Sequence, residues 1–323
     1  MDNPILINPP QCDCTDDGCN STSHIVLRAL KGGVMGILTT GVKNPRNSSP
    51  RSHGTIHDDK VASNLGFRGG AIAGSIHLDQ FGPVLVDAFG QQWFETGSLG
   101  LYFLHPLLDQ EPVEGFVDVG NADTPLSNSR CDVRMTTPDN TAVAEGTASV
   151  GQVSSPSPVT SRDRRSMQPS ELRMLSNVHL GMELEPVVES PSQGDQRDRV
   201  TSGLMTSPMD WYVNDSPWGG TICSPLTISR LMTSKVMQPL ERAIGKAVGL
   251  YGALELKHVN GPLFLDEDYV VSGVLTDVSE TPKTEVFWCD MNARLAKDPD
   301  AGIVATFTVM TRLVKASSPL YQS

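Results

Sequence analysis

Hydrophobic residues recur along the chain in two series of the same order, each with a long helix-like run followed by short strand-like runs. In the first series, residues 69–89 carry apolar side chains at helical spacing behind paired glycines. Residues 25–42, before this helix, predict a strand pair or the start of a long strand. Clusters of Gly, Pro, Asp or Asn separate the strand-like runs that follow the helix, at residues 93–104, 114–119, 130–135 and 142–150.

The second series repeats this order after residue 200. Residues 219–244 again predict a helix behind paired glycines, and Pro239 is expected to end or kink it late. The strand-like runs that follow lie at residues 249–258, 269–278, 285–295 and 303–314. The letters also repeat: residues 69–72 match 219–222 at an offset of 150, and 101–105 match 254–258 at an offset of 153. The pattern predicts a duplicated unit.

A helix that is apolar on most faces must be covered, and a strongly curved antiparallel sheet can wrap it. Two such units can join their sheets edge to edge and hide exposed strand edges. We therefore predict an α+β fold of two units, each a long helix wrapped by a curved antiparallel sheet. Composition sets the expected boundaries: a tail at 1–20, a first unit at 21–150, a Pro- and Ser-rich linker at 151–170 and a second unit at 171–323. Residues 189–199 read as a long solvated loop.

Composition and charge exclude several classes of protein. The 323 residues are 38% hydrophobic, which is too high for a disordered chain, and no apolar run approaches the ~20 residues of a membrane span. The formal net charge of −12 argues against a nucleic-acid groove. The start of the chain lacks the features of a secretory signal, so we expect a cytosolic protein. Cys12, Cys14 and Cys19 lack a second ligand pair for zinc, and we expect exposed thiols and no metal there.

Residues 57–74 resemble the active-site stretch of MaoC-like hotdog proteins, the (R)-specific enoyl-thioester hydratases and dehydratases. The residues in register are His57, Asp59, Ala62, Gly66, Phe67 and Gly74. The resemblance implies a double-hotdog fold and an enzyme that acts on an acyl thioester or a polyketide-like compound. It implies no metal and no redox cofactor.

The sequence departs from that family pattern just before His57. The family's catalytic aspartate falls on Ser52 and its asparagine on Gly54, while His53 stands next to the vacant position. Ser52, His53, Asp58 or Asp59 are the candidates to support His57. Without the full carboxylate–imidazole pair, we expect single proton transfers rather than ordinary hydration of a simple acyl thioester.

The residue types make chemical sense without the resemblance. A histidine titrates near neutrality and can move a proton to or from a substrate, so His57 is the candidate acid–base group. Gly74 lies near the amino end of the long helix, where its N–H could meet a developing oxyanion. The candidates for substrate binding are Phe67, Arg68, Gly70, His77, Trp211 and Trp218.

Each binding candidate has a structural alternative. His77 could be a core histidine, Trp211 and Trp218 could be core packing, and Arg68 could be a surface charge rather than a contact to a coenzyme A or carrier phosphate. The position 150 residues after His57 is Ser207, and no histidine stands in residues 207–218, so we expect a single working site in the first unit. His105 and His258 sit at matching strand ends and predict a shared structural role.

Together these features predict a lyase- or isomerase-type enzyme of specialised biosynthesis. Dehydration, a double-bond shift or cyclisation would each use histidine-assisted proton transfer on a small-molecule or thioester-linked substrate. One alternative is a pocket that shapes a reactive intermediate for cyclisation without acid–base help, as a pericyclase does. Another is a non-catalytic partner in a biosynthetic complex. We expect no nucleic-acid or membrane partner, and the sequence leaves a homodimer open.

Overall fold

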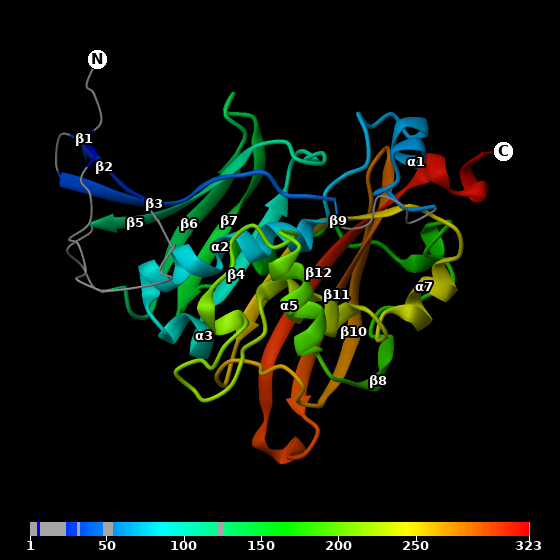
Figure 1. Cartoon of the computed structure of the whole chain (residues 1–323). Helices are drawn as coiled ribbons and strands as arrows, with labels where there is room; N and C mark the ends of the chain where they lie inside the picture. Colours follow the sequence, from blue (N-terminus) through cyan, green and yellow to red (C-terminus); the bar gives the residue numbers. More distant parts are fainter. Residues whose placement is uncertain (1–4, 7–23, 31–32, 48–53, 122–125, 323) are drawn as a thin grey trace.

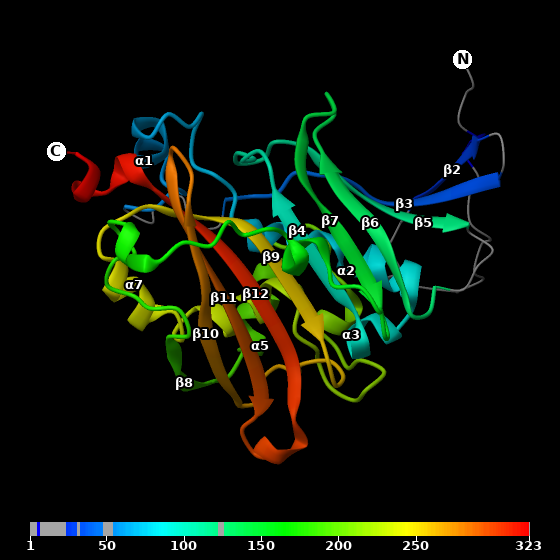
Figure 2. The ribbon, with the colours of Figure 1, turned by 180° about the vertical axis from the view of Figure 1, so that it is seen from behind.

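Twelve strands of the described residues form one antiparallel sheet that crosses the protein (Figures 1 and 2). The computed structural model describes residues 5–6, 24–30, 33–47, 54–121 and 126–322. Along the sheet the strand order is β1-β2-β3-β5-β6-β7-β4-β9-β12-β11-β10-β8. The strands are β1 (Ile5–Leu6), β2 (His24–Leu30), β3 (Gly33–Lys43), β4 (Ser98–Phe103), β5 (Val113–Asn121), β6 (Ser129–Thr136), β7 (Ala142–Val150), β8 (Glu183–Glu189), β9 (Gly249–His258), β10 (Tyr269–Glu280), β11 (Thr284–Leu295) and β12 (Ile303–Val314).

The two halves of the chain meet where β4 pairs with β9. Gly100 lies opposite Glu255 in this pair, and the strands on either side follow in mirrored order. A Cβ atom on Gly100 would meet the side chain of Val159 at 3.1 Å and that of Glu255 at 3.4 Å, so the absence of a side chain on Gly100 lets these neighbours pack closely against the junction. Because β4 pairs with β9, the backbone hydrogen bonds of the sheet continue from one half into the other.

The long helix α2 covers one face of the sheet, where it packs against β3, β5, β4 and β9 (Figure 1). Helix α6 of the second half packs against α2. Large side chains between these layers, including Phe81, Trp93 and Phe307, are fully buried, and each contributes about 1.5–3 kcal/mol by leaving water. The helices are α1 (Asp59–Asn64), α2 (Gly74–Phe89), α3 (Gln92–Thr96), α4 (Pro158–Ser161), α5 (Gln193–Thr201), α6 (Pro225–Thr233) and α7 (Gln238–Ile244).

Three of the predicted elements differ from the structure. The run expected as a strand at 93–104 begins as helix α3, which buries Trp93 and Phe94, before β4 starts. The helix expected at 219–244 is two helices, α6 and α7, and Pro239 lies in the first turn of α7, where no N–H donor is required. The expected solvated loop at 189–199 contains most of α5, in which Gln196 is buried and donates hydrogen bonds to the backbone oxygens of Tyr212 and Ile222.

Corresponding hydrogen bonds recur in the two halves and fix which residues correspond. Ile72 N donates to Leu107 O at 2.7 Å before α2, and Cys223 N donates to Leu263 O at 2.8 Å before α6. Ile72 therefore corresponds to Cys223, at an offset of 151 residues rather than the 150 expected from the letters. It follows that Gly74, the first residue of α2, corresponds to Pro225, the first residue of α6.

A second set of bonds corrects the offset at the strand ends. The N–H groups of Leu104 and His105 both reach Val143 O, and those of Val259 and Asn260 both reach Val304 O. His105 therefore corresponds to Asn260 and not to His258. His258 is fully buried beside Trp93, with ring centroids 5.2 Å apart, and has a different environment from the exposed His105.

Candidate functional site

A cavity of about 820 Å³ lies between the two halves of the chain. The first half lines it with residues from 54–57, 65–77 and 103–107, and the second half with residues from 233–251, 283–287 and 309–314. Four of the residues proposed from the sequence line this cavity: His57, Phe67, Gly74 and His77. Ser52, His53 and the tail cysteines lie outside the residues that the structure describes.

The ring of His57 is held by a backbone carbonyl. Its Nδ1 lies 2.7 Å from Ala71 O. Because a carbonyl oxygen only accepts, Nδ1 carries the hydrogen and Nε2 is the basic nitrogen of the neutral ring. The side chain is half-buried, and the backbone oxygen of His57 accepts a hydrogen bond from Asn47 Nδ2 at 2.8 Å. The imidazole is therefore oriented at the cavity with one fixed tautomer.

Two carboxylates shape the loop that carries His57. Asp58 caps α1, since its Oδ1 accepts from Lys60 N at 2.9 Å and from Val61 N at 3.0 Å. Asp59 Oδ1 accepts from Gly70 N at 2.8 Å. A Cβ atom on Gly70 would lie 2.3 Å from His57 O, so only glycine allows this close approach. Asp59 and Gly70 thus position the loop without lining the cavity.

The amino end of α2 faces the same cavity. Gly74 is the first residue of this 16-residue helix, where N–H groups have no acceptor within the helix. The ring of Phe103 lies across this end, and a Cβ atom on Gly74 would lie 2.6 Å from Phe103 Cε2. The helix dipole makes this end attractive to a developing negative charge.

His77 follows one turn later on α2 and is almost completely buried, at 3% exposed. Burial lowers the pKa of His77 to about 4, although Gln80 on the next turn opposes the shift. The ring is therefore neutral at neutral pH. Its Nδ1 has no hydrogen-bond partner among the described residues, although the side chain borders the cavity.

His105, which sequence reasoning assigned to a structural role, also lines the cavity. Its side chain is exposed, and its Nδ1 lies 2.7 Å from Ala142 O. As at His57, this contact leaves Nε2 as the basic nitrogen. No local pattern indicated this position, because the match of letters paired His105 with the buried His258.

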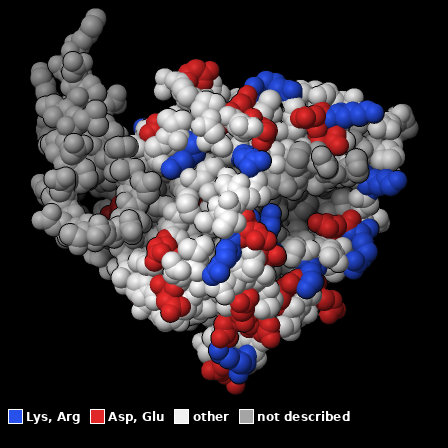
Figure 3. Space-filling view, in the orientation of Figure 1, with Lys and Arg blue, Asp and Glu red and all other residues white. Residues whose placement is uncertain are grey.

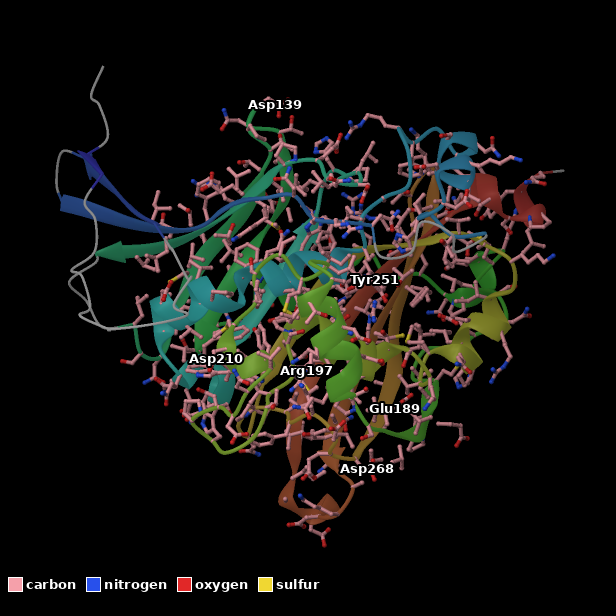
Figure 4. All side chains as sticks on the ribbon, in the orientation of Figure 1. Asp139, Glu189, Arg197, Asp210, Tyr251 and Asp268 are labelled. Carbon is pink, nitrogen blue, oxygen red and sulfur yellow. The ribbon has the colours of Figure 1, made fainter. Side chains whose placement is uncertain are left out.

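The second half supplies polar groups to the opposite wall. Burial raises the pKa of Tyr251, on β9, and also that of Glu241, on α7. Both residues line the cavity. Figure 4 shows Tyr251 in the middle of the molecule, whereas Asp139 lies at the tip of the β6–β7 hairpin. The cavity therefore combines imidazoles from one half with a phenol and a carboxyl group from the other.

Besides Gly70, three of the proposed binding residues lie away from the cavity lining. Arg68 is exposed and forms a two-bond ion pair with Glu111, at 2.6 and 3.0 Å, so its charge is already paired. Trp211 and Trp218 pack edge to face, with centroids 5.6 Å apart, and Trp218 Nε1 donates to Glu95 Oε1 at 3.0 Å. The two tryptophans belong to an aromatic cluster around Phe94 and pack against the hydrophobic core.

A tyrosine stands in the second half where the first half has His57. Ala71 N donates to Ile56 O, and the corresponding Ile222 N donates to Trp211 O, both at 3.0 Å. Tyr212 follows Trp211 as His57 follows Ile56, so the counterpart of His57 is Tyr212 and not Ser207. Tyr212 is fully buried, and its carbonyl accepts from Gln196 Nε2 at 2.8 Å. Its ring fills the space next to Gly82 of α2.

Comparison of the structure with solved structures identifies the fold. A protein from Chloroflexus aurantiacus described as a MaoC domain dehydratase is 13% identical, with a TM-score of 0.55, over 90% of this chain and 95% of its own. A MaoC-like dehydratase is 14% identical, with a TM-score of 0.51, over 88% and 99%. A Mycobacterium tuberculosis protein described as a double hotdog is 11% identical, with a TM-score of 0.52, over 85% and 94%. The chain has the double-hotdog fold.

Comparison of the sequence with family models and with curated proteins identifies no relative. No family model matches the chain, and no curated protein matches it significantly.

The described residues contain no group of three His, Cys, Asp or Glu side chains placed to hold a metal ion. None of the helices in the described ranges combines the length and apolar character needed to cross a membrane. On the face shown in Figure 3, acidic and basic side chains are interspersed.

Proposed function

We propose that this double-hotdog protein is a MaoC-like enzyme that processes an acyl thioester or a related carbonyl compound, with His57 as its proton-transfer residue. One observation carries the proposal: His57 and the first turn of α2 line the same cavity. The dehydratases described above are similar in fold, which supports the substrate class.

In the proposed reaction, His57 Nε2 removes a proton from the carbon next to the substrate carbonyl. The electrons of that C–H bond form an enolate, and the negative oxygen is stabilised by the N–H of Gly74 and the dipole of α2. The imidazolium can return the proton at another carbon, which shifts a double bond. Alternatively, a group on the neighbouring carbon departs with its bonding electrons, which forms a double bond.

The contrast between the two halves supports these roles. At the positions of His57 and Gly74, the second half has Tyr212, which does not titrate near neutrality, and Pro225, which has no N–H to donate. The second half therefore lacks both groups that the reaction needs. We propose that the first half carries the chemistry and that the second half supplies the opposite wall.

The size of the cavity favours a substrate larger than a short acyl chain, as in specialised biosynthesis. Both walls of the described cavity come from one chain. Size-exclusion chromatography with light scattering would test separately whether the chain forms a homodimer.

The test is exchange of the proton next to the carbonyl of butyryl, octanoyl and dodecanoyl N-acetylcysteamine thioesters in D2O, followed by proton NMR. The wild type should accelerate exchange, and His57→Asn should reduce it by about 10²–10⁴-fold. The asparagine amide can still donate to Ala71 O, so the thermal midpoint should hardly change. Tyr212→Phe is the matched control and should keep full exchange. Exchange that survives in His57→Asn would refute the proposed base.

A further inference from the structure

We propose that His105 is the second acid–base group of this cavity and gives the proton to the leaving group. The inference rests on the proposed function of His57. The related family uses a catalytic aspartate at the position that Ser52 occupies here, and we assign the role of that aspartate to His105. The argument uses the position of His105, the state of its ring and its counterpart in the second half.

His105 and His57 lie on two chain segments that are bonded to each other. Ala71, whose carbonyl holds the ring of His57, forms a β-bridge with Leu108, three residues after His105. The neighbouring Ile72 N donates to Leu107 O at 2.7 Å. These bonds hold the segment of His105 against the segment that orients His57 and begins α2. Both histidines consequently border one cavity.

The ring of His105 is held by a backbone carbonyl, as the ring of His57 is. Its Nδ1–H is committed to Ala142 O at 2.7 Å, so the proton that comes and goes is on Nε2. The side chain is exposed, so water can restore that proton after each turnover. A ring fixed by a backbone carbonyl keeps this nitrogen in one direction.

The second half shows that the structural part of this arrangement does not need a histidine. Asn260 corresponds to His105, and its Nδ2 donates to Ile303 O at 3.0 Å, as His105 Nδ1 donates to Ala142 O. The backbone bonds also correspond, at 3.4 Å for His105 N to Val143 O and 3.3 Å for Asn260 N to Val304 O. An amide thus suffices to tie this strand end down. The first half has titratable rings at both positions, His57 and His105, and the second half has Tyr212 and Asn260.

The proposed step is elimination of water from a 3-hydroxyacyl thioester. His57 Nε2 takes the proton next to the carbonyl, and the C–H electrons form the new C=C bond. The C–O bond to the hydroxyl group breaks, and the protonated His105 gives its Nε2 proton to that oxygen, which leaves as water. His57 ends protonated and His105 neutral, and proton exchange with solvent restores both.

The experiment compares two reactions on the same protein. Exchange in butyryl, octanoyl and dodecanoyl N-acetylcysteamine thioesters needs only the base, whereas elimination from the (3R)- and (3S)-3-hydroxy derivatives of these thioesters needs the base and the proton donor. His105→Asn copies the second half and keeps a donor to Ala142 O. It should retain exchange and lose elimination by about 10²–10⁴-fold. Asn260→Ala, the control, removes the corresponding bond away from the cavity and should retain both reactions.

The other outcomes also decide the question. If His105→Asn keeps both reactions, or loses both, His105 is not the proton donor. If the wild type exchanges but eliminates water from none of these thioesters, the role of His105 is refuted while that of His57 stands. If the wild type does neither, the proposed function fails, and the role of His105 fails with it.

Discussion

The carboxylate of Asp79, on α2, caps the helix that faces it across the junction of the two halves: its Oδ1 accepts a hydrogen bond from Leu226 N at 2.6 Å. Asp79 is 2% exposed, and its Oδ2 has no partner within the described part of the chain. Burial raises the pKa of Asp79 to about 6, although the bond from Leu226 and the charges of Arg199 and Arg230 oppose the shift. The carboxylate therefore joins the two helices at a cost in stability when it ionises.

This cost predicts a pH dependence. The pKa of Asp79 is about 6 in the folded protein and 3.8 in the unfolded chain, so the folded state binds the proton more tightly. The free energy of unfolding should fall by about 3 kcal/mol in all, of which about 2 kcal/mol is lost between pH 4 and pH 6, and it should level off above about pH 7. Asp79→Asn keeps an oxygen that can accept from Leu226 but does not titrate. Urea denaturation at pH 4.5 and 7.5 should show a smaller loss in the variant, and equal losses would contradict the assignment.

Gly70→Ala should damage the loop that carries His57. The added Cβ would meet His57 O at 2.3 Å, so the backbone must shift and the bond from Gly70 N to Asp59 weakens. We expect a loss of about 2 kcal/mol in the free energy of unfolding and a large loss of exchange activity. Gly194→Ala is the control, because its Cβ would meet only Ser192 Oγ at an ordinary 3.5 Å. A stable, active Gly70→Ala variant would show that the close approach is not required.

Gly74→Pro and Gly74→Ala separate the N–H of Gly74 from its lack of a side chain. Both add a Cβ against the ring of Phe103, but only proline removes the N–H. Proline suits the first position of a helix, and the preceding Ala73 has the extended backbone that proline requires. Exchange rates should be about 10²-fold lower in Gly74→Pro than in Gly74→Ala. Equal rates in the two variants would remove Gly74 as the oxyanion donor.

Tyr212→Phe should be tolerated in both stability and activity. The Tyr212 hydroxyl is buried without a partner among the described residues, and burial raises the pKa of Tyr212 far above its usual value. Removing it should leave the free energy of unfolding unchanged or raise it by about 1 kcal/mol. A thermal melt and the exchange assay would measure both. A large destabilisation would mean that the hydroxyl has a partner or fills space that packing needs.

The sequence predicts the parts of this fold that a local pattern determines. The strands at 249–258 and 303–314 and the helix that ends at Phe89 appear as their hydrophobic spacing indicates, because burial alone decides them. Trp93 and Phe94 read as part of a strand, yet they lie on a short helix because both rings pack into the core between α2 and β9. That contact spans more than 150 residues, and no local pattern shows it.

The candidate site was predicted unevenly for the same reason. His57, Phe67 and Gly74 come from one continuous stretch, so their shared cavity follows from a short motif. His105, Tyr251 and Glu241 reach the cavity from distant strands and helices, and only the sheet topology brings them there. The match of letters does not show that Asn260 is the counterpart of His105, because the offset between the halves changes from 151 residues at Ile72 to 155 residues at His105. The break between α6 and α7 accounts for this drift, since Gly90 and Gly245 end the corresponding helices.

The same break lies in the wall of the cavity that the second half supplies. Thr233, Ser234 and Met237, at the interruption between α6 and α7, border the cavity opposite the imidazoles. Under the proposed function, substitutions or insertions at this interruption would alter that wall without touching a proton-transfer group. Under the proposed function, acyl-chain preference would therefore change at this wall while the order of bond making and breaking stays the same.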